Sequence, residues 1–201
     1  MNRYDTVVFD LDGTLLNTLD DLADAVNYVM RMNHYPERTV DEVRRFVGNG
    51  IRRLMELATP ESVTGEAFES VFEEFKNYYT EHCQIKTCAY EGIMSLLERL
   101  YASGYEMAIV SNKNHAAVCE LNEIYFKKYI KVAIGQQDGI QKKPAPDTVL
   151  QALKELGKEK DTAIYVGDSE VDFLTAQNTG MDCALVTWGF RTREELSEFT
   201  P

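Results

Sequence analysis

Residues Thr6–Asp21 read T-V-V-F-D-L-D-G-T-L-L-N-T-L-D-D, and this stretch decides how the rest of the chain is interpreted. The β-branched and aromatic run Thr6–Phe9 is typical of a strand buried on both faces, and it ends in Asp10, Asp12 and Gly13. In open α/β sheets, ligands bind at the carboxyl ends of the strands. Two carboxylates on alternate residues of one short segment repel each other unless a cation or a proton relay occupies the gap. We take a hard divalent metal ion as the simplest occupant.

The length and charge of the chain restrict the class of protein. At 201 residues it is long enough for one α/β core with a modest accessory domain. Its 21 basic and 33 acidic residues give a net charge of -12, which argues against a nucleic-acid partner and against an anionic membrane surface. A phosphate ligand would then need a local positive site. No apolar run approaches the roughly 18 residues of a membrane span, and no signal-peptide pattern precedes the first strand, so we expect a cytoplasmic protein.

After the first strand, the pattern predicts a helical insertion and then an alternation of strands and helices. From residue 16 to residue 85, apolar residues recur at helical spacing, and no segment resembles a strand of the main sheet. We therefore predict an α/β core formed by residues 1–15 and 86–201, and an inserted all-helical domain formed by residues 16–85. The later strands are expected at 105–110, 132–134, 163–166 and 183–186, and the helices between and after them at 92–103, 116–126, 148–156 and 171–178. This alternation predicts a Rossmann-like parallel sheet with helices on both faces.

Polar residues gather where the predicted strands end. They are Asp10 and Asp12, then Ser111 and Asn112, then Asp168, with Lys143 in a loop that follows another strand. Because parallel strands end at the same edge of a sheet, we expect these side chains to share one pocket. Several carboxylates with one lysine, one hydroxyl and one amide suit Mg²⁺ and a phosphoryl group, whose charge needs both a metal and a cation.

These residues lie in four motifs that resemble those of the haloacid dehalogenase superfamily of phosphohydrolases, in particular the phosphoglycolate phosphatase type with a helical cap. The motifs are Asp10-Leu11-Asp12-Gly13-Thr14, Ser111-Asn112, Lys143-Pro144-Ala145-Pro146 and Gly167-Asp168-Ser169-Glu170-Val171-Asp172. They occur in the family's order and span almost the whole chain, and the helical insertion falls where this family carries its cap. The first and fourth motifs are specific, whereas the other two would be weak alone. The resemblance implies magnesium-dependent hydrolysis of a small phosphomonoester, phosphoglycolate or a similar metabolite.

The resemblance also implies a role for each motif residue. Asp10 is expected to attack the phosphorus and form an aspartyl-phosphate, and Asp12 to protonate the leaving alcohol and then to activate water. The implied metal ligands are Asp10, the backbone carbonyl of Asp12, and Asp168. Asp172 is expected to lie behind these ligands and to orient Lys143, which offsets the charge of the transferring group. The expected phosphate contacts are Thr14, Ser111 and the backbone of Asn112.

The helical insertion contains a second candidate region. Val47-Gly48-Asn49-Gly50 resembles the substrate-facing loop of the phosphoglycolate phosphatase cap. Glycines let a ligand approach the backbone closely, and Arg52 or Arg53 could reach a substrate carboxylate. We therefore expect substrate contacts from Gly48, Asn49, Gly50 and Arg52. The alternative, a helix N-terminus followed by two surface arginines, stays open.

Other functions fit parts of this pattern. A sugar-phosphate mutase of the β-phosphoglucomutase type would share Asp10 and Asp12, although Thr14 resembles the phosphatases, since mutases more often carry an apolar residue there. Inorganic pyrophosphatase or nucleotidase activity stays open, and a carbon–halogen hydrolase is disfavoured because such relatives lack the second acid. A phospho-receiver signalling module also combines an acidic pocket with a lysine, but it carries no helical insertion after its first strand. We expect a small phosphorylated metabolite as the partner, and a monomer or a homodimer.

Overall fold

The computed structural model describes residues 3–199 and separates the chain into two compact units. One unit consists of the chain up to Leu16 and from Ala89 onward, and the other consists of Asn17–Cys88. Two-residue strands, β2 (Leu16–Asn17) and β3 (Cys88–Ala89), pair where the chain passes from one unit to the other. The assignment of these units as a catalytic core and a cap stays a prediction.

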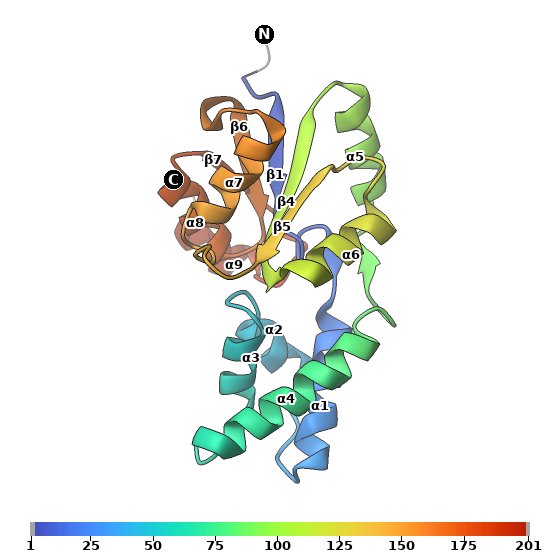
Figure 1. The fold of residues 1–201 in the computed structure, drawn as a ribbon, viewed down its shortest axis with the longest axis vertical. Coiled ribbons are helices and arrows are strands. Elements are labelled where there is room, and N and C mark those ends of the chain that lie inside the picture. The colour runs from blue at the N-terminus through green and yellow to red at the C-terminus, as the bar shows by residue number, and fades with distance from the viewer. Residues whose placement is uncertain (1–2, 200–201) are drawn as a thin grey trace. The chain divides into compact units, whose positions relative to one another are not determined.

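The first unit is built on a five-stranded parallel sheet of order β5-β4-β1-β6-β7 (Figure 1). Its strands are β1 (Thr6–Phe9), β4 (Glu106–Asn114), β5 (Val132–Gln136), β6 (Ala163–Gly167) and β7 (Asp182–Leu185). All residues of β1 are buried, as expected for a central strand that is covered on both faces. The predicted α/β class is confirmed.

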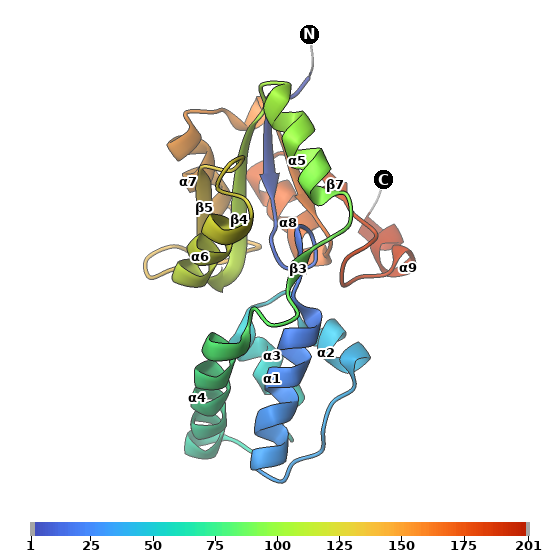
Figure 2. The same cartoon turned by 90° about the vertical axis from the view of Figure 1, so that its right-hand side faces the viewer.

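The alternation of side chains along β1 separates two apolar layers, one on each face of the sheet. Val7 and Phe9 pack with residues of α5 (Ile93–Ala102) and α6 (His115–Tyr125), whereas Val8 packs with residues of α7 (Asp147–Leu156) and α8 (Glu170–Thr179). Figures 1 and 2 show these helices around the sheet. The remaining short elements of this unit are η1 (Lys160–Thr162), α9 (Arg193–Leu196) and η2 (Ser197–Phe199).

The strand β4 differs from the prediction at its carboxyl end. The sequence pattern predicts a strand that ends at Val110, but the observed one continues through Ser111, Asn112 and Lys113 to Asn114, with a shift in its register against β5. The side chains of Ser111, Asn112 and Lys113 are buried. A change from apolar to polar residues usually indicates the end of a strand, whereas these side chains find polar partners within the protein and remain in the sheet.

The second unit is entirely helical apart from its linking strands. It consists of α1 (Leu19–Met32), α2 (Val40–Phe46), α3 (Ile51–Ala58) and α4 (Gly65–His82). Its core combines aliphatic residues of α1 and α3 with the aromatic residues Phe72 and Phe75 of α4. None of the helices in the described residues 3–199 is both long and apolar enough to span a membrane.

Asp21 joins the two ends of this helical unit. Its side chain lies in the first turn of α1 and is only 3% exposed. It accepts hydrogen bonds from the backbone N–H of Lys86 at 2.9 Å and from both the backbone N–H and the hydroxyl of Thr87 at 2.8 Å. Because this buried carboxylate accepts several hydrogen bonds from residues 86 and 87, it fixes the segment that follows α4 beside the start of α1.

We expect Asp21→Ala to lower the free energy of unfolding by about 2–3 kcal/mol, because three donors lose a charged acceptor in a buried place. Urea denaturation followed by circular dichroism measures this loss. Asp20→Ala is the matched control, since Asp20 is exposed one residue earlier. Equal effects of the two substitutions would contradict the role of Asp21.

Candidate active site

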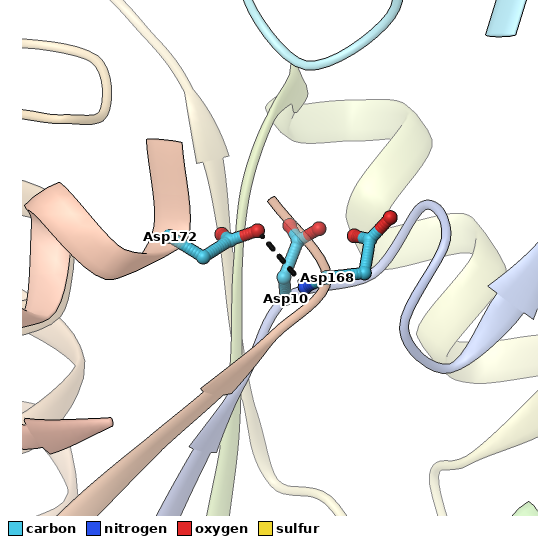
Figure 3. A group of neighbouring side chains, drawn as sticks. All are labelled: Asp10, Asp168 and Asp172. Atoms are coloured by element: carbon cyan, nitrogen blue, oxygen red, sulfur yellow. Dashed lines mark hydrogen bonds between the residues drawn. The ribbon is translucent and has the colours of Figure 1, made fainter. Parts of the chain in front are cut away.

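Three buried carboxylates meet at the carboxyl edge of the sheet. Asp10 directly follows β1, Asp168 follows β6, and Asp172 lies in the first turn of α8. Each offers a carboxylate oxygen within 4.8 Å of those of the other two. Figure 3 shows the three side chains, together with the hydrogen bond from the backbone N–H of Asp168 to Asp172. The sequence motifs that are farthest apart along the chain therefore form one cluster.

Lys143 supplies the positive charge of this cluster. Its side chain is 3% exposed, and its Nζ lies 2.7 Å from Oδ1 of Asp10 and 2.7 Å from Oδ1 of Asp172. It also donates to the hydroxyl of Tyr165, at 3.1 Å. Burial alone would lower the pKa of Lys143, but Asp10 and Asp172 hold that pKa well above its ordinary value. The lysine is therefore a fixed cation at neutral pH.

Asp172 is saturated with hydrogen bonds. Its Oδ1 accepts from Lys143 and from the Tyr165 hydroxyl at 3.0 Å, and its Oδ2 accepts from the backbone N–H of Asp168 and from the N–H and hydroxyl of Ser169. Although burial raises the pKa of Asp172, Lys143 and these donors lower it below the usual value for an aspartate. Both oxygens are occupied by donors, so this side chain is better placed to orient Lys143 than to bind a metal ion.

The other two carboxylates are less well compensated. Burial raises the pKa of Asp10 well above its usual range in spite of Lys143, and Asp172 and Asp168 raise it further. Burial and the charge of Asp172 likewise raise the pKa of Asp168 to about 7. Within the described part of the chain, this cluster brings three carboxylates around one ammonium group. Such an excess of buried negative charge, offered by oxygen ligands, fits a hard divalent cation.

Asp168 is held from the first motif and from the loop that follows β7. Its Oδ1 accepts a hydrogen bond from the Thr14 hydroxyl at 3.2 Å, and its Oδ2 accepts one from the backbone N–H of Phe190 at 2.7 Å. There is no room beside it, because a Cβ added to Gly13 or to Gly189 would lie 2.4 Å from atoms of Asp168. Gly13 also has a φ of +91°, which disfavours other residues. Both neighbours of the carboxylate must therefore be glycine.

The second motif holds the third one in place. Asn112 Oδ1 accepts a hydrogen bond from the backbone N–H of Lys143 at 2.8 Å, and its Nδ2 donates to the carbonyl of the same residue at 3.1 Å. The Ser111 hydroxyl accepts from the backbone N–H of Lys113 at 3.1 Å. The predicted contacts of Ser111, the Asn112 backbone and Thr14 with phosphate remain predictions, but the Asn112 side chain has a defined structural task.

The glycine loop of the helical unit lies between α2 and α3. Gly48 and Gly50 have φ values of +123° and +85°, so this turn depends on glycine. Arg52, in the first turn of α3, donates to both carboxylate oxygens of Glu69, at 3.0 and 2.8 Å, and its guanidinium lies 4.7 Å from the ring centroid of Phe72. The expected substrate contacts of Gly48, Asn49, Gly50 and Arg52 remain predictions. The ion pair with Glu69 was not foreseen, because the partner lies on another helix.

Comparison with known proteins places the chain in a family. The family model for haloacid dehalogenase-like hydrolases matches residues 7–186 of the sequence. The chain belongs to this family.

Relatives and solved structures narrow the class of this hydrolase. Phosphoglycolate phosphatase 1 of Pseudomonas aeruginosa is 32% identical, over 97% of this chain and 74% of the relative. Phosphoglycolate phosphatase of Aquifex aeolicus is 31% identical, over 96% of this chain and 90% of the relative. A crystal structure from Lactobacillus delbrueckii subsp. bulgaricus, described as a "putative phosphoglycolate phosphatase", is 36% identical with a TM-score of 0.93, covering 98% of this chain and 92% of that one. This hydrolase is a phosphatase.

Three residues that contact the acidic groups of the site are not among those predicted from the sequence. Lys113 donates to Asp12 at 3.1 Å, and its position directly after Ser111-Asn112 was a signal that could have indicated it. Tyr165 lies within an apolar strand, where an aromatic residue is usually a core residue. Phe190 acts through its backbone N–H, so its side-chain type carries no signal at all.

Replacing Asp172 tests the importance of the ion pairs around Lys143. We expect Asp172→Asn to lower the free energy of unfolding by about 3–5 kcal/mol, because a buried ammonium loses a charged partner and an amide group faces several donors. Urea denaturation with an unchanged m-value measures this effect. Asp182→Asn is the control: its ion pair with Arg3 is exposed, so its loss is expected to change stability by less than about 1 kcal/mol. Similar values for both variants would show that the buried pair contributes no more than the exposed one.

Proposed function

We propose that this phosphatase depends on Mg²⁺ and hydrolyses a small phosphomonoester, phosphoglycolate or a similar metabolite, through an aspartyl-phosphate on Asp10. The observation that carries the proposal is the pairing of the buried Asp10 carboxylate with Lys143 at 2.7 Å, beside Asp168. A carboxylate fixed in this way at a strand end is suited to in-line attack on phosphorus. The names of the relatives from Pseudomonas aeruginosa and Aquifex aeolicus support phosphoglycolate as the first substrate to test.

The proposed reaction has two steps, each carried by residues of this chain. In the first step, an oxygen of Asp10 forms a bond to phosphorus while the ester P–O bond breaks, and Asp12 gives its proton to the leaving alcohol. In the second step, Asp12 takes a proton from a water molecule, which attacks the phosphorus and releases phosphate and Asp10. Lys143 offsets the charge of Asp10 and of the transferring oxygens, and Ser111, the backbone of Asn112 and Thr14 bind those oxygens.

The residues that would hold the metal ion are Asp10, Asp168 and the backbone carbonyl of Asp12. When bound, a divalent ion neutralises the two carboxylates and polarises the phosphoryl group. These are hard oxygen ligands, which Mg²⁺ prefers. Asp172 is left out of this set, because its oxygens already accept hydrogen bonds from Lys143, Tyr165 and the start of α8.

Removal of metal ions tests the cofactor. We expect release of phosphate from 2-phosphoglycolate to fall by at least about 100-fold with a chelator and to return with added Mg²⁺, because the charge on the transferring group then lacks its counter-ion. A second readout is thermal stability, since an ion that binds the folded state at 100 times its Kd stabilises it by about 2.7 kcal/mol. Asp168→Asn should abolish that stabilisation. Activity unaffected by chelation would exclude the metal ion from the mechanism.

The nucleophile is tested by Asp10→Asn. We expect the turnover of 2-phosphoglycolate to fall by at least about 10³-fold, because the amide cannot form the acyl-phosphate bond. Acid-quenched wild-type enzyme should carry a base-labile phosphoryl group, and the variant should carry none. Asp161→Asn, at the opposite edge of the sheet, serves as the control for loss of one exposed carboxylate. Near-normal activity of Asp10→Asn would overturn the proposal.

A further inference from the structure

We propose that Lys113 is a positioning residue for Asp12: its ammonium group holds the Asp12 carboxyl group in the orientation that serves proton transfer to the leaving alcohol. This inference rests on the proposed function, because it assumes that Asp12 is the general acid. It adds a second lysine to the proposed mechanism. Lys113 contacts Asp12, whereas Lys143 contacts Asp10 and Asp172.

The geometry of the pair is well defined. Lys113 Nζ lies 3.1 Å from Oδ1 of Asp12, and the two side chains are 6% and 15% exposed. Asp12 follows β1 and Lys113 lies near the end of β4, the neighbour of β1 in the sheet. The contact therefore joins two adjacent strand ends, and it is buried enough to escape most of the screening that weakens surface ion pairs.

Consecutive residues of β4 hold two different parts of the site. The Asn112 side chain binds the backbone of Lys143, whereas the Lys113 side chain reaches the first motif. The backbone N–H of Lys113 is bound by the Ser111 hydroxyl, which fixes the start of the lysine side chain. The extension of β4 beyond Val110 is what brings this ammonium group to Asp12.

Asp12 needs such a partner more than the other acids do. Asp10, Asp168 and Asp172 form one buried cluster, whereas the Asp12 side chain is not part of it and is 15% exposed. The terminal torsion of an aspartate has a broad minimum, so the carboxyl group turns freely unless a neighbour fixes it. A misplacement of about 1 Å in a reacting group can cost about 100-fold in rate. An ammonium group bound to Oδ1 fixes the plane of the Asp12 carboxyl group and thereby the direction in which Oδ2 points.

The test compares two substrates that differ in their need for a proton. The leaving group of 4-nitrophenyl phosphate is 4-nitrophenolate, which departs as a stable anion without a proton. The leaving group of 2-phosphoglycolate is an alkoxide, which must be protonated as it departs. We expect Lys113→Met to lower kcat/KM for 2-phosphoglycolate by about 10- to 100-fold, and that for 4-nitrophenyl phosphate by less than about 3-fold. The ratio of the two values is measured on one preparation, so it does not depend on how much of the variant is folded.

A double-mutant cycle separates positioning from direct contact with the substrate. On an Asp12→Asn background, Lys113→Met should cause no further change in the substrate ratio or in kcat/KM for 2-phosphoglycolate, because its target is already gone. Lys113→Arg, which keeps a cation at this place, should retain the wild-type ratio. Lys154→Met, at an exposed site on α7, is the control for loss of one positive charge.

The outcomes distinguish this inference from the proposed function. Equal losses for both substrates in Lys113→Met, or a further loss on the Asp12→Asn background, would overturn the positioning role and leave the function standing. Failure of the wild-type enzyme to hydrolyse either phosphomonoester with Mg²⁺ would instead overturn the function itself.

Discussion

The arrangement of the first unit depends on one buried ammonium group held between two carboxylates. Lys143 donates to Asp10 and Asp172 at the same distance of 2.7 Å, and the side chains of all three are almost completely buried. Removing charges from water is unfavourable by several kcal/mol per ion, so each of these groups is tolerated in the interior only when the others are in place. The central strand, the loop after β5 and the helix α8 are thereby brought to a common point.

Two carboxylates of the same cluster destabilise the folded protein when they are ionised. Asp10 and Asp168 remain insufficiently compensated, as the upward direction of both pKa shifts indicates. Perturbed carboxylates of this kind are concentrated at functional sites, since a fold selected for stability alone would neutralise them or replace them. In this phosphatase the excess negative charge fits the divalent ion that we propose for the site.

Much of this arrangement could be predicted from the sequence, because the relevant signals are local. The apolar run of β1 followed by Asp10 and Asp12 indicated a buried strand that ends in a site, and the alternation of strands and helices indicated a parallel sheet. Most of the contacts that were missed have no local signal in the sequence. Phe190 contributes a backbone N–H, and the Arg52–Glu69 pair depends on the packing of two helices. Lys113 directly follows Ser111-Asn112 in the sequence, but its contact with Asp12 depends on the continuation of β4 past Val110.

The position of Gly189 and Phe190 ties the site to a segment outside the sheet. The last strand, β7, ends at Leu185, and these two residues follow it in a loop. Phe190 is buried, and its backbone N–H is a hydrogen-bond donor to Asp168. A substitution that displaces this loop therefore changes the surroundings of Asp168 while the order of the strands stays intact.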